Sequence, residues 1–197
     1  MKQWLRMTTL VLILATGLAF SAETRAEDPS IDSASAVTDL KDLYVRFKVK
    51  VFGLARIIGR FERLRGKMVS DADGQGADVH MHIDVDSVNT NDEGRDDYLR
   101  GPTFFAAEQH PQITFSGSCL YRVQDGTRHI VGDLSLRGVT RRVTFKVEPL
   151  SHEEGSASGG YQATATIRRS EFGLTTLQHI VSDEVEIIVA MNTGTDA

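Results

Sequence analysis

The chain has 197 residues, a length that predicts a single domain, with or without a removable segment, rather than two full domains. With 41% hydrophobic and 25% charged residues, 17 glycines, 4 prolines and 1 cysteine, it is typical of globular proteins, and disordered, collagen-like and disulfide-stapled chains are excluded. The formal net charge of −5 argues against nucleic acid as a partner and against membrane binding by bulk charge, because both rely on an excess of Lys and Arg.

The first residues have the pattern of a secretion signal. Two cations precede the run Met7–Phe20, which is 14 residues long and carries no charge. A membrane-spanning helix needs about 20 apolar residues, whereas the apolar part of a signal peptide has about 7 to 15 and is followed by small residues. We therefore expect residues 1–26 to be a signal peptide cleaved after Ala26, and the protein to be periplasmic. Cleavage after Ser21 and an uncleaved amino-terminal anchor are the alternatives.

After the signal peptide we expect a leader arm over 27–42 and one barrel domain over 43–197. The leader is small and polar without a sustained period, and it can also be read as a weak first strand. Because Cys119 is the sole cysteine, an intrachain disulfide is excluded, and the exported domain must be held together by its core.

From Leu43 onward apolar and polar residues alternate with period two, which is typical of strands with one buried face. The alternation predicts eight strands, over 44–52, 57–69, 77–85, 112–122, 127–136, 140–147, 161–167 and 185–189. Antiparallel strands in this number can close into a barrel without open edges. We therefore expect an all-β fold, an eight-stranded antiparallel barrel, with a two-sheet sandwich as the alternative.

The segment 87–111, between the third and fourth predicted strands, shows no alternation. A connection of about 25 residues inside a compact domain usually carries function or short helices. We expect one or two helical turns here, capped by Asn91 or Asp92, and hence a short helical crossover between strands 3 and 4.

Three charged residues of this crossover, Arg95, Asp96 and Arg100, are candidates for a polar site. Asp96 and Arg100 are four residues apart and can pair on a helix. In a functional reading, Arg95 and Arg100 form a polar mouth of the barrel and bind a pyrophosphate or quinone head group, because guanidinium binds such oxygens in bidentate fashion. In a structural reading, an Arg–Asp pair fixes the crossover to the barrel; we favour this for Asp96 and leave it open for Arg100.

The inward-facing residues of the predicted strands are almost wholly apolar. A closed apolar lumen that its own side chains do not fill binds an apolar ligand. The predicted ligand-binding lining consists of Phe61, Val79, Met81, Ile83, Ile113, Phe115, Tyr121, Leu134, Phe145, Ala163, Ile167 and Ile187. A slip of one residue in register would turn any of these sets outward. Small inward residues such as Gly117 and Ala163 serve either as room for a ligand or as sites of close packing, and the sequence does not separate the two.

No metal or cofactor site is predicted. His80 and His82 lie with Asp78, Asp84 and Asp86 on one strand face. Side chains two residues apart on a strand are about 6.6 Å apart, whereas zinc needs three or four convergent ligands, so a solvated face is the better reading. The other histidines lack the spacing of a catalytic triad and no serine lies in a nucleophile motif, so no enzyme activity is expected.

Two further features receive structural readings. The basic dipeptides 141–142 and 168–169 are read as solvated strand faces or strand ends. Cys119, on an inward stripe, is read as a small buried apolar residue. Neither adds a chemical function.

A more specific signal comes from segments that follow one another in a fixed order. They are Val88–Asn91, Arg95-Asp96, Leu99-Arg100, Phe104-Phe105, His110–Phe115, Gly132–Thr140, Arg169–Gly173 and Val181–Val185. Together they resemble the signature of the YceI-like family: Gly132–Thr140 resembles its G-x-L-T-(I/L)-x-G-V-T pattern and Arg169–Gly173 its R-x-x-F-G pattern. The resemblance covers about Val45 to Met191.

The resemblance implies a lipocalin-like eight-stranded antiparallel barrel, a periplasmic location, and the binding of polyisoprenoids or other long-chain amphiphiles in the barrel. It implies no catalytic activity. Many members of the family read F-x-V-x-H-x-G in the first strand, and here Phe47, Val49 and Gly53 are kept while Val51 stands at the His position. The head-group preference of this chain is therefore not carried over from the family.

We accordingly expect an exported protein that binds a polyisoprenoid or similar long-chain lipid for transport, storage or sequestration. One alternative is an accessory that presents a quinone to a membrane redox partner, and a weaker one is an enzyme acting on a lipid head group. Neither nucleic acid nor a cofactor is expected, and the sequence leaves the oligomeric state open, a dimer included.

Overall fold

The structure is a computed structural model, and it describes residues 36–40, 42–71, 76–121, 128–150 and 160–192. The predicted signal peptide, both candidate cleavage sites and residues 27–35 of the predicted leader arm lie outside the described residues. All described residues belong to one unit by their internal contacts.

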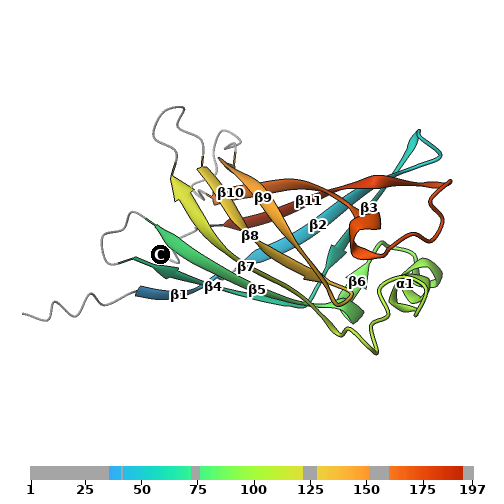
Figure 1. Ribbon diagram of the computed structural model, residues 1–197, viewed down its shortest axis with the longest axis horizontal. Coiled ribbons are helices and arrows are strands. Elements are labelled where there is room, and N and C mark those ends of the chain that lie inside the picture. The colour runs from blue at the N-terminus through green and yellow to red at the C-terminus, as the bar shows by residue number, and fades with distance from the viewer. Residues whose placement is uncertain (1–35, 41, 72–75, 122–127, 151–159, 193–197) are drawn as a thin grey trace, which may run out of the picture. The chain divides into compact units, whose positions relative to one another are not determined.

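One antiparallel sheet contains the eleven strands found in the described residues (Figure 1). In chain order they are β1 (Ala36–Leu40), β2 (Leu43–Val51), β3 (Ala55–Phe61), β4 (Leu64–Ser70), β5 (Ala77–Asp84), β6 (Val88–Asn89), β7 (Gln112–Tyr121), β8 (Arg128–Leu136), β9 (Val139–Pro149), β10 (Gly160–Arg168) and β11 (Val181–Asn192). The hydrogen-bonded order is β1-β4-β5-β7-β8-β9-β10-β11-β2-β3-β6. The last strand, β11, therefore pairs with an early one, β2.

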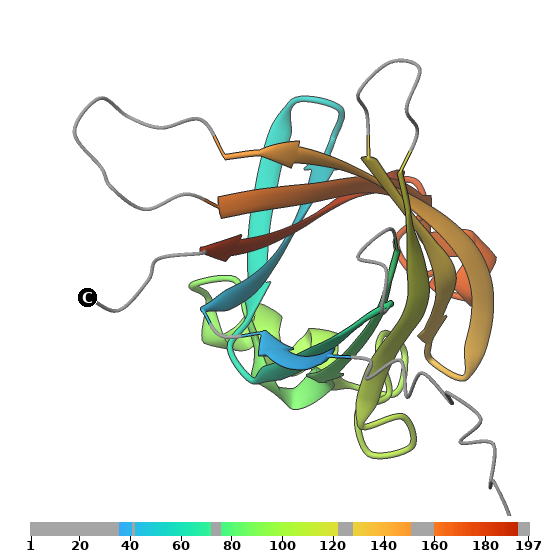
Figure 2. The same cartoon turned by 90° about the vertical axis from the view of Figure 1, so that its left-hand side faces the viewer.

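The sheet curls into a half-barrel (Figure 2). The prediction of an all-β antiparallel fold is confirmed, but the predicted number of eight strands is wrong. Three differences account for the count: β1 lies in the predicted leader arm, β6 is a two-residue strand, and the predicted strand 57–69 is divided into β3 and β4. The division occurs at a corner where the Glu62 amide donates to Ser87 O (3.1 Å) and Arg63 O accepts from the Asp84 amide (2.9 Å).

The strands β3 and β4 follow one another but do not pair, since β3 pairs with β2 and β6 whereas β4 pairs with β1 and β5. Side chains bridge this side of the half-barrel instead. Leu40 and Leu43 lie over Gly66 of β4, so that a Cβ added at Gly66 would be 3.1 Å and 3.0 Å from them. Glycine is needed here because of this close approach.

The helix α1 (Glu93–Arg100) lies in the connection between β6 and β7 and so follows the sixth strand, not the third. Asp92, one of the two predicted caps, accepts a hydrogen bond from the Arg95 amide (3.0 Å). Leu99 is buried and anchors the helix to the barrel. None of the helices in the described residues has the length and hydropathy needed to cross a membrane.

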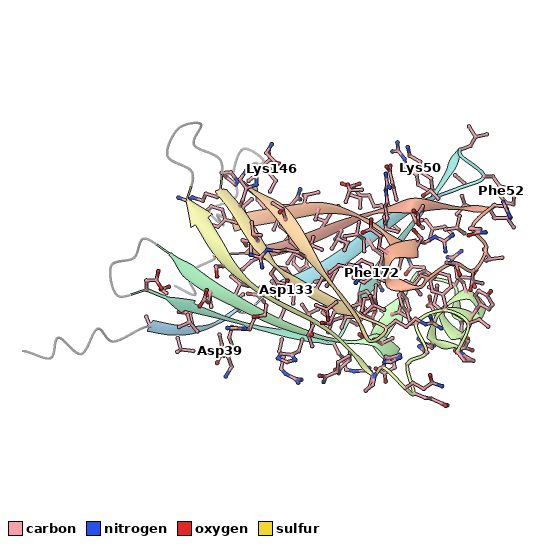
Figure 3. All side chains as sticks on the ribbon, viewed as in Figure 1. Asp39, Lys50, Phe52, Asp133, Lys146 and Phe172 are labelled. Atoms are coloured by element: carbon pink, nitrogen blue, oxygen red, sulfur yellow. The ribbon has the colours of Figure 1, made fainter. Side chains whose placement is uncertain are left out.

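Two 3₁₀ turns complete the fold, η1 (Val85–Ser87) after β5 and η2 (Arg169–Phe172) after β10. Phe172 is almost completely buried, and Figure 3 shows it inside the fold. Gly173 ends η2 with φ +74°, a backbone conformation that glycine adopts without strain. In Figure 1, η2 and α1 lie at the same end of the half-barrel, where the β2–β3 hairpin also projects.

Candidate functional site

A cavity of about 510 Å³ occupies the interior of the half-barrel. Its walls are the inward side chains of the strands, which alternate with outward polar ones, as in β5, where Ala77, Val79, Met81 and Ile83 are buried. This volume falls in the range of about 300 to 1,000 Å³ found for small-molecule sites. The side chains that point into the half-barrel therefore leave part of its interior unfilled.

Eleven of the twelve residues predicted to line the lumen border this cavity. They are Phe61, Val79, Met81, Ile83, Ile113, Phe115, Leu134, Phe145, Ala163, Ile167 and Ile187. Tyr121 belongs to β7, but its side chain lies outside the described part of the chain. That these residues bind a ligand stays a prediction.

The structure separates the two uses of small inward residues. Gly117 and its cross-strand partner Gly132 lie under the ring of Phe115, since a Cβ added at either would come within 2.8 Å of that ring. They serve close packing. Ala163 and the half-buried Cys119 border the cavity and so leave it room.

The lining has polar groups toward its ends. Among the described lining residues, the polar side chains are Arg95, Tyr98, Cys119, Arg128, Tyr161 and Arg169. Arg95 and Tyr98 come from α1 and Arg169 from η2, whereas Arg128 and Tyr161 begin β8 and β10 at the opposite end, where the Arg128 guanidinium lies 5.5 Å from the Tyr161 ring centre. An apolar middle with cations toward both ends matches an amphiphile better than a purely apolar molecule.

Arg95 borders the cavity as a half-buried side chain. Its Nε donates to Thr90 Oγ1 (2.8 Å), its Nη2 donates to Thr90 O (2.9 Å), and its Nη1 lies 3.7 Å from an oxygen of Asp92. The guanidinium is thus held in one orientation by its Nε and Nη2 atoms. Because a guanidinium carries five N–H groups, these contacts leave it capacity for a further hydrogen bond.

Arg100 is not among the described residues that line the cavity. Its Nε donates to Asp86 O (2.9 Å) and its Nη2 to Val88 O (3.0 Å), while its Nη1 pairs with Asp97 (2.7 Å). The pairing expected between Arg100 and Asp96 is wrong, because Asp96 is already engaged elsewhere.

Asp96 is buried and accepts hydrogen bonds from the amide (2.9 Å) and the hydroxyl (2.5 Å) of Thr90. It therefore ties α1 to the residue that follows β6, and its partner is a threonine of the crossover rather than an arginine. The result is a network in which Thr90 also accepts from Arg95.

Arg169 is a residue of the site that the sequence did not single out. The reading of 168–169 as a solvated dipeptide is wrong for Arg169, which is 3% exposed, although Arg168 is exposed. Burial lowers the pKa of the Arg169 guanidinium from its ordinary value.

Four backbone carbonyls accept hydrogen bonds from Arg169. They belong to Leu174 (2.6 Å), Thr176 (2.7 Å), Val181 (3.0 Å) and Ser182 (3.0 Å). One side chain therefore holds the whole loop between η2 and β11 against the cavity wall. The family-like segment Arg169–Gly173 was the available signal, but it did not show what the arginine contacts.

Asp183 fixes the other side of this loop. Its carboxylate accepts hydrogen bonds from the amide (2.9 Å) and the hydroxyl (2.8 Å) of Ser170. These bonds, the amide bond first, lower the pKa of Asp183 below its ordinary value.

Asp183 is expected to make part of the stability depend on pH. Because its folded-state pKa is the lower one, its contribution is complete above the unfolded-state value of 3.8 and is lost as the pH falls through the folded-state value. Asp183→Asn should therefore lower the free energy of unfolding at pH 7, and the difference from the unaltered protein should shrink toward pH 3, as measured by urea denaturation. Glu184→Gln is the control, because no described residue donates to that carboxylate; an equal effect there would contradict the assignment.

The His80 face is polar and outward. His80 and Asp78 are exposed, with Ser116 Oγ 3.0 Å from His80 Nδ1 and Ser118 donating to Asp78 (2.6 Å). Among the described residues, no three His, Cys, Asp or Glu side chains are grouped so that they could hold a metal ion.

Comparison with known proteins gives the same fold. The family model of the YceI-like domain matches residues 30–193. A UPF0312 protein of Pectobacterium carotovorum is 29% identical over an alignment of 195 residues that covers 96% of this chain and 95% of the relative.

Two solved structures are also similar. The crystal structure of BcnA from Burkholderia cenocepacia has a TM-score of 0.67 and 24% identity, covering 77% of this chain and 96% of that one. A polyisoprenoid binding domain from Saccharophagus degradans, implicated in plant cell wall breakdown, has a TM-score of 0.58 and 17% identity, covering 81% of this chain and 98% of that one. At these identities the likeness shows a shared fold.

Proposed function

Because the chain belongs to the YceI-like domain family, we propose that it is a lipid-binding protein that holds a polyisoprenoid or similar long-chain amphiphile inside the half-barrel. The observation that carries the proposal is the cavity of about 510 Å³, whose walls are apolar along the strands and cationic toward the ends. A neighbour of the same fold is described as a polyisoprenoid binding domain, which supports the class of ligand.

Burial of the ligand's chain supplies the affinity. Apolar surface removed from water contributes about 25 cal/mol per Å², and a long chain offers surface along the whole cavity. The wall is built from hydrogen-bonded strands, which limits the ordering cost of binding. Apolar contacts have no fixed hydrogen-bond geometry. The cavity wall therefore selects ligands by the length and shape of their chain rather than binding one molecule only.

We assign the polar head group to Arg95. Its guanidinium is oriented by Thr90, and the residue borders the cavity. Phosphate and quinone oxygens both accept hydrogen bonds from guanidinium, so the two head groups remain to be separated by experiment. The other predicted arginine, Arg100, binds backbone carbonyls and is left out of this role.

The role we propose is transport, storage or sequestration of the lipid outside the cytoplasm, following the expected signal peptide over 1–26. A binding protein needs no catalytic group, and the proposal assigns none. The mass of the head group distinguishes a quinone from an isoprenyl phosphate. A quinone would favour a role beside a redox protein.

The expected result of purifying the protein without detergent from a periplasmic extract is a long-chain isoprenoid bound in stoichiometric amount. Organic extraction followed by mass spectrometry measures it, with an acid-denatured sample as the blank. A protein whose extract holds no lipid, and which takes up none when offered isoprenoids, would contradict the proposal.

An Arg95→Gln variant extends this experiment. Retention of the chain with a changed head-group composition would locate the head group at Arg95, since glutamine keeps hydrogen bonding but removes the charge. Arg100→Gln is the matched control, and it should leave the extracted lipid unchanged.

A further inference from the structure

The hairpin between β2 and β3 ends in two exposed apolar residues. Phe52 is 72% exposed and Leu54 is 92% exposed, with Gly53 between them. Lys50 and Arg56, both exposed, flank the pair, and we call these four residues the β2–β3 tip. Figure 3 shows Phe52 and Lys50 at one end of the half-barrel, whereas Asp39 lies toward the other.

The backbone of Phe52 has an unfavourable conformation. Its φ of +50° lies in the left-handed region, which is unfavourable for a bulky residue. Its amide donates to Ile180 O (2.8 Å), so the tip is tied to the loop before β11. Unfavourable backbone geometry that the surroundings hold in place is often found at functional positions.

The charges of the tip are not neutralised by the described carboxylates around them. Lys50 and Arg56 face each other across the hairpin, and like charges in this position are destabilising. Within the described residues, neither side chain has a carboxylate within ion-pair distance. Of the nearby carboxylates on β11, Asp183 binds Ser170 and Glu186 pairs with Lys48 (3.4 Å), while Glu184 is exposed.

The hairpin sequence is cationic although the protein is acidic. From Lys48 to Arg60 it contains four Lys or Arg residues and no Asp or Glu, in a chain of net charge −5. Lys48 is paired with Glu186 and Arg60 with Glu62, so the cations left for an anionic partner are Lys50 and Arg56 of the tip.

The cavity ends next to the tip, although none of the four tip residues lines it. Val51, next to Phe52, lines it, and so do Leu177 and Ile180 of the neighbouring loop. These two are also 44% and 36% exposed, so the cavity reaches the surface beside the tip. A chain leaving the cavity here would emerge next to Phe52 and Leu54.

We propose that the β2–β3 tip docks the protein on the surface of an anionic phospholipid bilayer. Phe52 and Leu54 enter the boundary between head groups and acyl chains, and Lys50 and Arg56 contact lipid phosphates. The lipid then passes between bilayer and cavity without crossing water. This last step rests on the proposed function of the cavity, whereas docking does not.

A bilayer fits the tip better than a protein does. A stable protein interface buries about 800 Å² on each partner, which two apolar side chains on a projecting turn cannot supply. A bilayer needs only a few inserted side chains together with cations at the level of the phosphates.

The test is sedimentation with vesicles of phosphatidylcholine, with or without phosphatidylglycerol, using protein recovered from the periplasm. The unaltered protein should bind the anionic vesicles, and added salt should weaken binding. Phe52→Ser/Leu54→Ser and Lys50→Glu/Arg56→Glu should each weaken it about tenfold or more. All variants share the same amino terminus, so any contribution of that segment to vesicle binding is equal in all of them and does not affect the comparison.

The matched control is Arg65→Glu/Lys67→Glu on the outer face of β4, which makes the same change in net charge at another exposed site. It should bind as the unaltered protein does. Equal loss in this control would mean that bulk charge acts, and unchanged binding of the tip variants would exclude the tip. Failure of every form to bind anionic vesicles would overturn the proposal and favour a protein partner.

A second readout guards against an effect on folding. In Leu54→Trp the new indole should shift its emission to shorter wavelength on anionic vesicles, whereas Lys67→Trp should not. Lipid extraction from the same preparations keeps the two proposals apart. If the tip variants no longer sediment with vesicles but still contain bound lipid, the result supports docking by the tip. If no preparation contains lipid, the result counts against the cavity proposal only.

Discussion

Replacing Ala163 by Trp is expected to weaken lipid binding strongly while the half-barrel still folds. Ala163 lies on β10 opposite Val189 of β11 and Val147 of β9, and all three border the cavity. An indole at this position projects into the space that the ligand's chain would occupy. The affinity should fall about a hundredfold, equivalent to about 2.7 kcal/mol, as measured by titrating the delipidated protein with dansyl-farnesol.

The fold should tolerate this change because the added ring enters an existing cavity rather than a filled core. Overpacking of a filled core costs about 1 to 3 kcal/mol, and a smaller loss of stability is expected here. Thr164→Trp is the matched control, since this neighbour alternates to the other face of β10. Full binding by Ala163→Trp would show that the ligand lies outside the cavity.

Replacing Arg169 by Ala is expected to cause a large loss of stability. The four carbonyls that its guanidinium binds would lose a charged donor at once. Removing one partner from a buried charged network costs about 3 to 5 kcal/mol. For a chain of this size the midpoint of thermal unfolding should fall by roughly 10 °C, as measured by circular dichroism.

Arg168→Ala supplies the control for this prediction. Arg168 is the preceding residue, but it is exposed, and surface substitutions usually change stability by less than about 0.5 kcal/mol. Arg169→Lys should fall between the two, because it keeps the charge but has one donor atom instead of three. A loss with Arg169→Ala no greater than with Arg168→Ala would contradict the role given to the guanidinium.

Most of the strands could be predicted from the sequence because they have one buried face. The almost wholly exposed β1 and the two-residue β6 could not. Val79, Met81 and Ile83 alternate with polar residues, and the structure places all three in the cavity wall. The division of 57–69 could not be predicted in the same way. Its corner, Glu62 and Arg63, is made by residues that do not break a strand, and it depends on hydrogen bonds to Ser87 and Asp84.

The polar contacts of the site could be predicted only where the partners are close in sequence. The cap at Asp92 was of this kind. Arg100 pairs with Asp97 because Asp96 is engaged by Thr90, a competition that spacing on a helix does not reveal. Arg169 depends on acceptors spread over the loop that follows it, and a basic dipeptide carries no information about that loop.

The pairing of β2 with β11 has a consequence for how the chain acquires its structure. Lys48 and Glu186, which pair across these strands, are 138 residues apart in sequence. This ladder therefore joins the first long strand to the last, and contacts of such high sequence separation form slowly, because a large loop must close first. A nascent chain cannot complete the half-barrel before its final strand has been made. One edge of β2 thus stays without its partner throughout synthesis, although β3 pairs with the other edge. The half-barrel stays incomplete for the same time, which suits a chain that we propose to be exported, because such a chain has to cross a membrane before it folds.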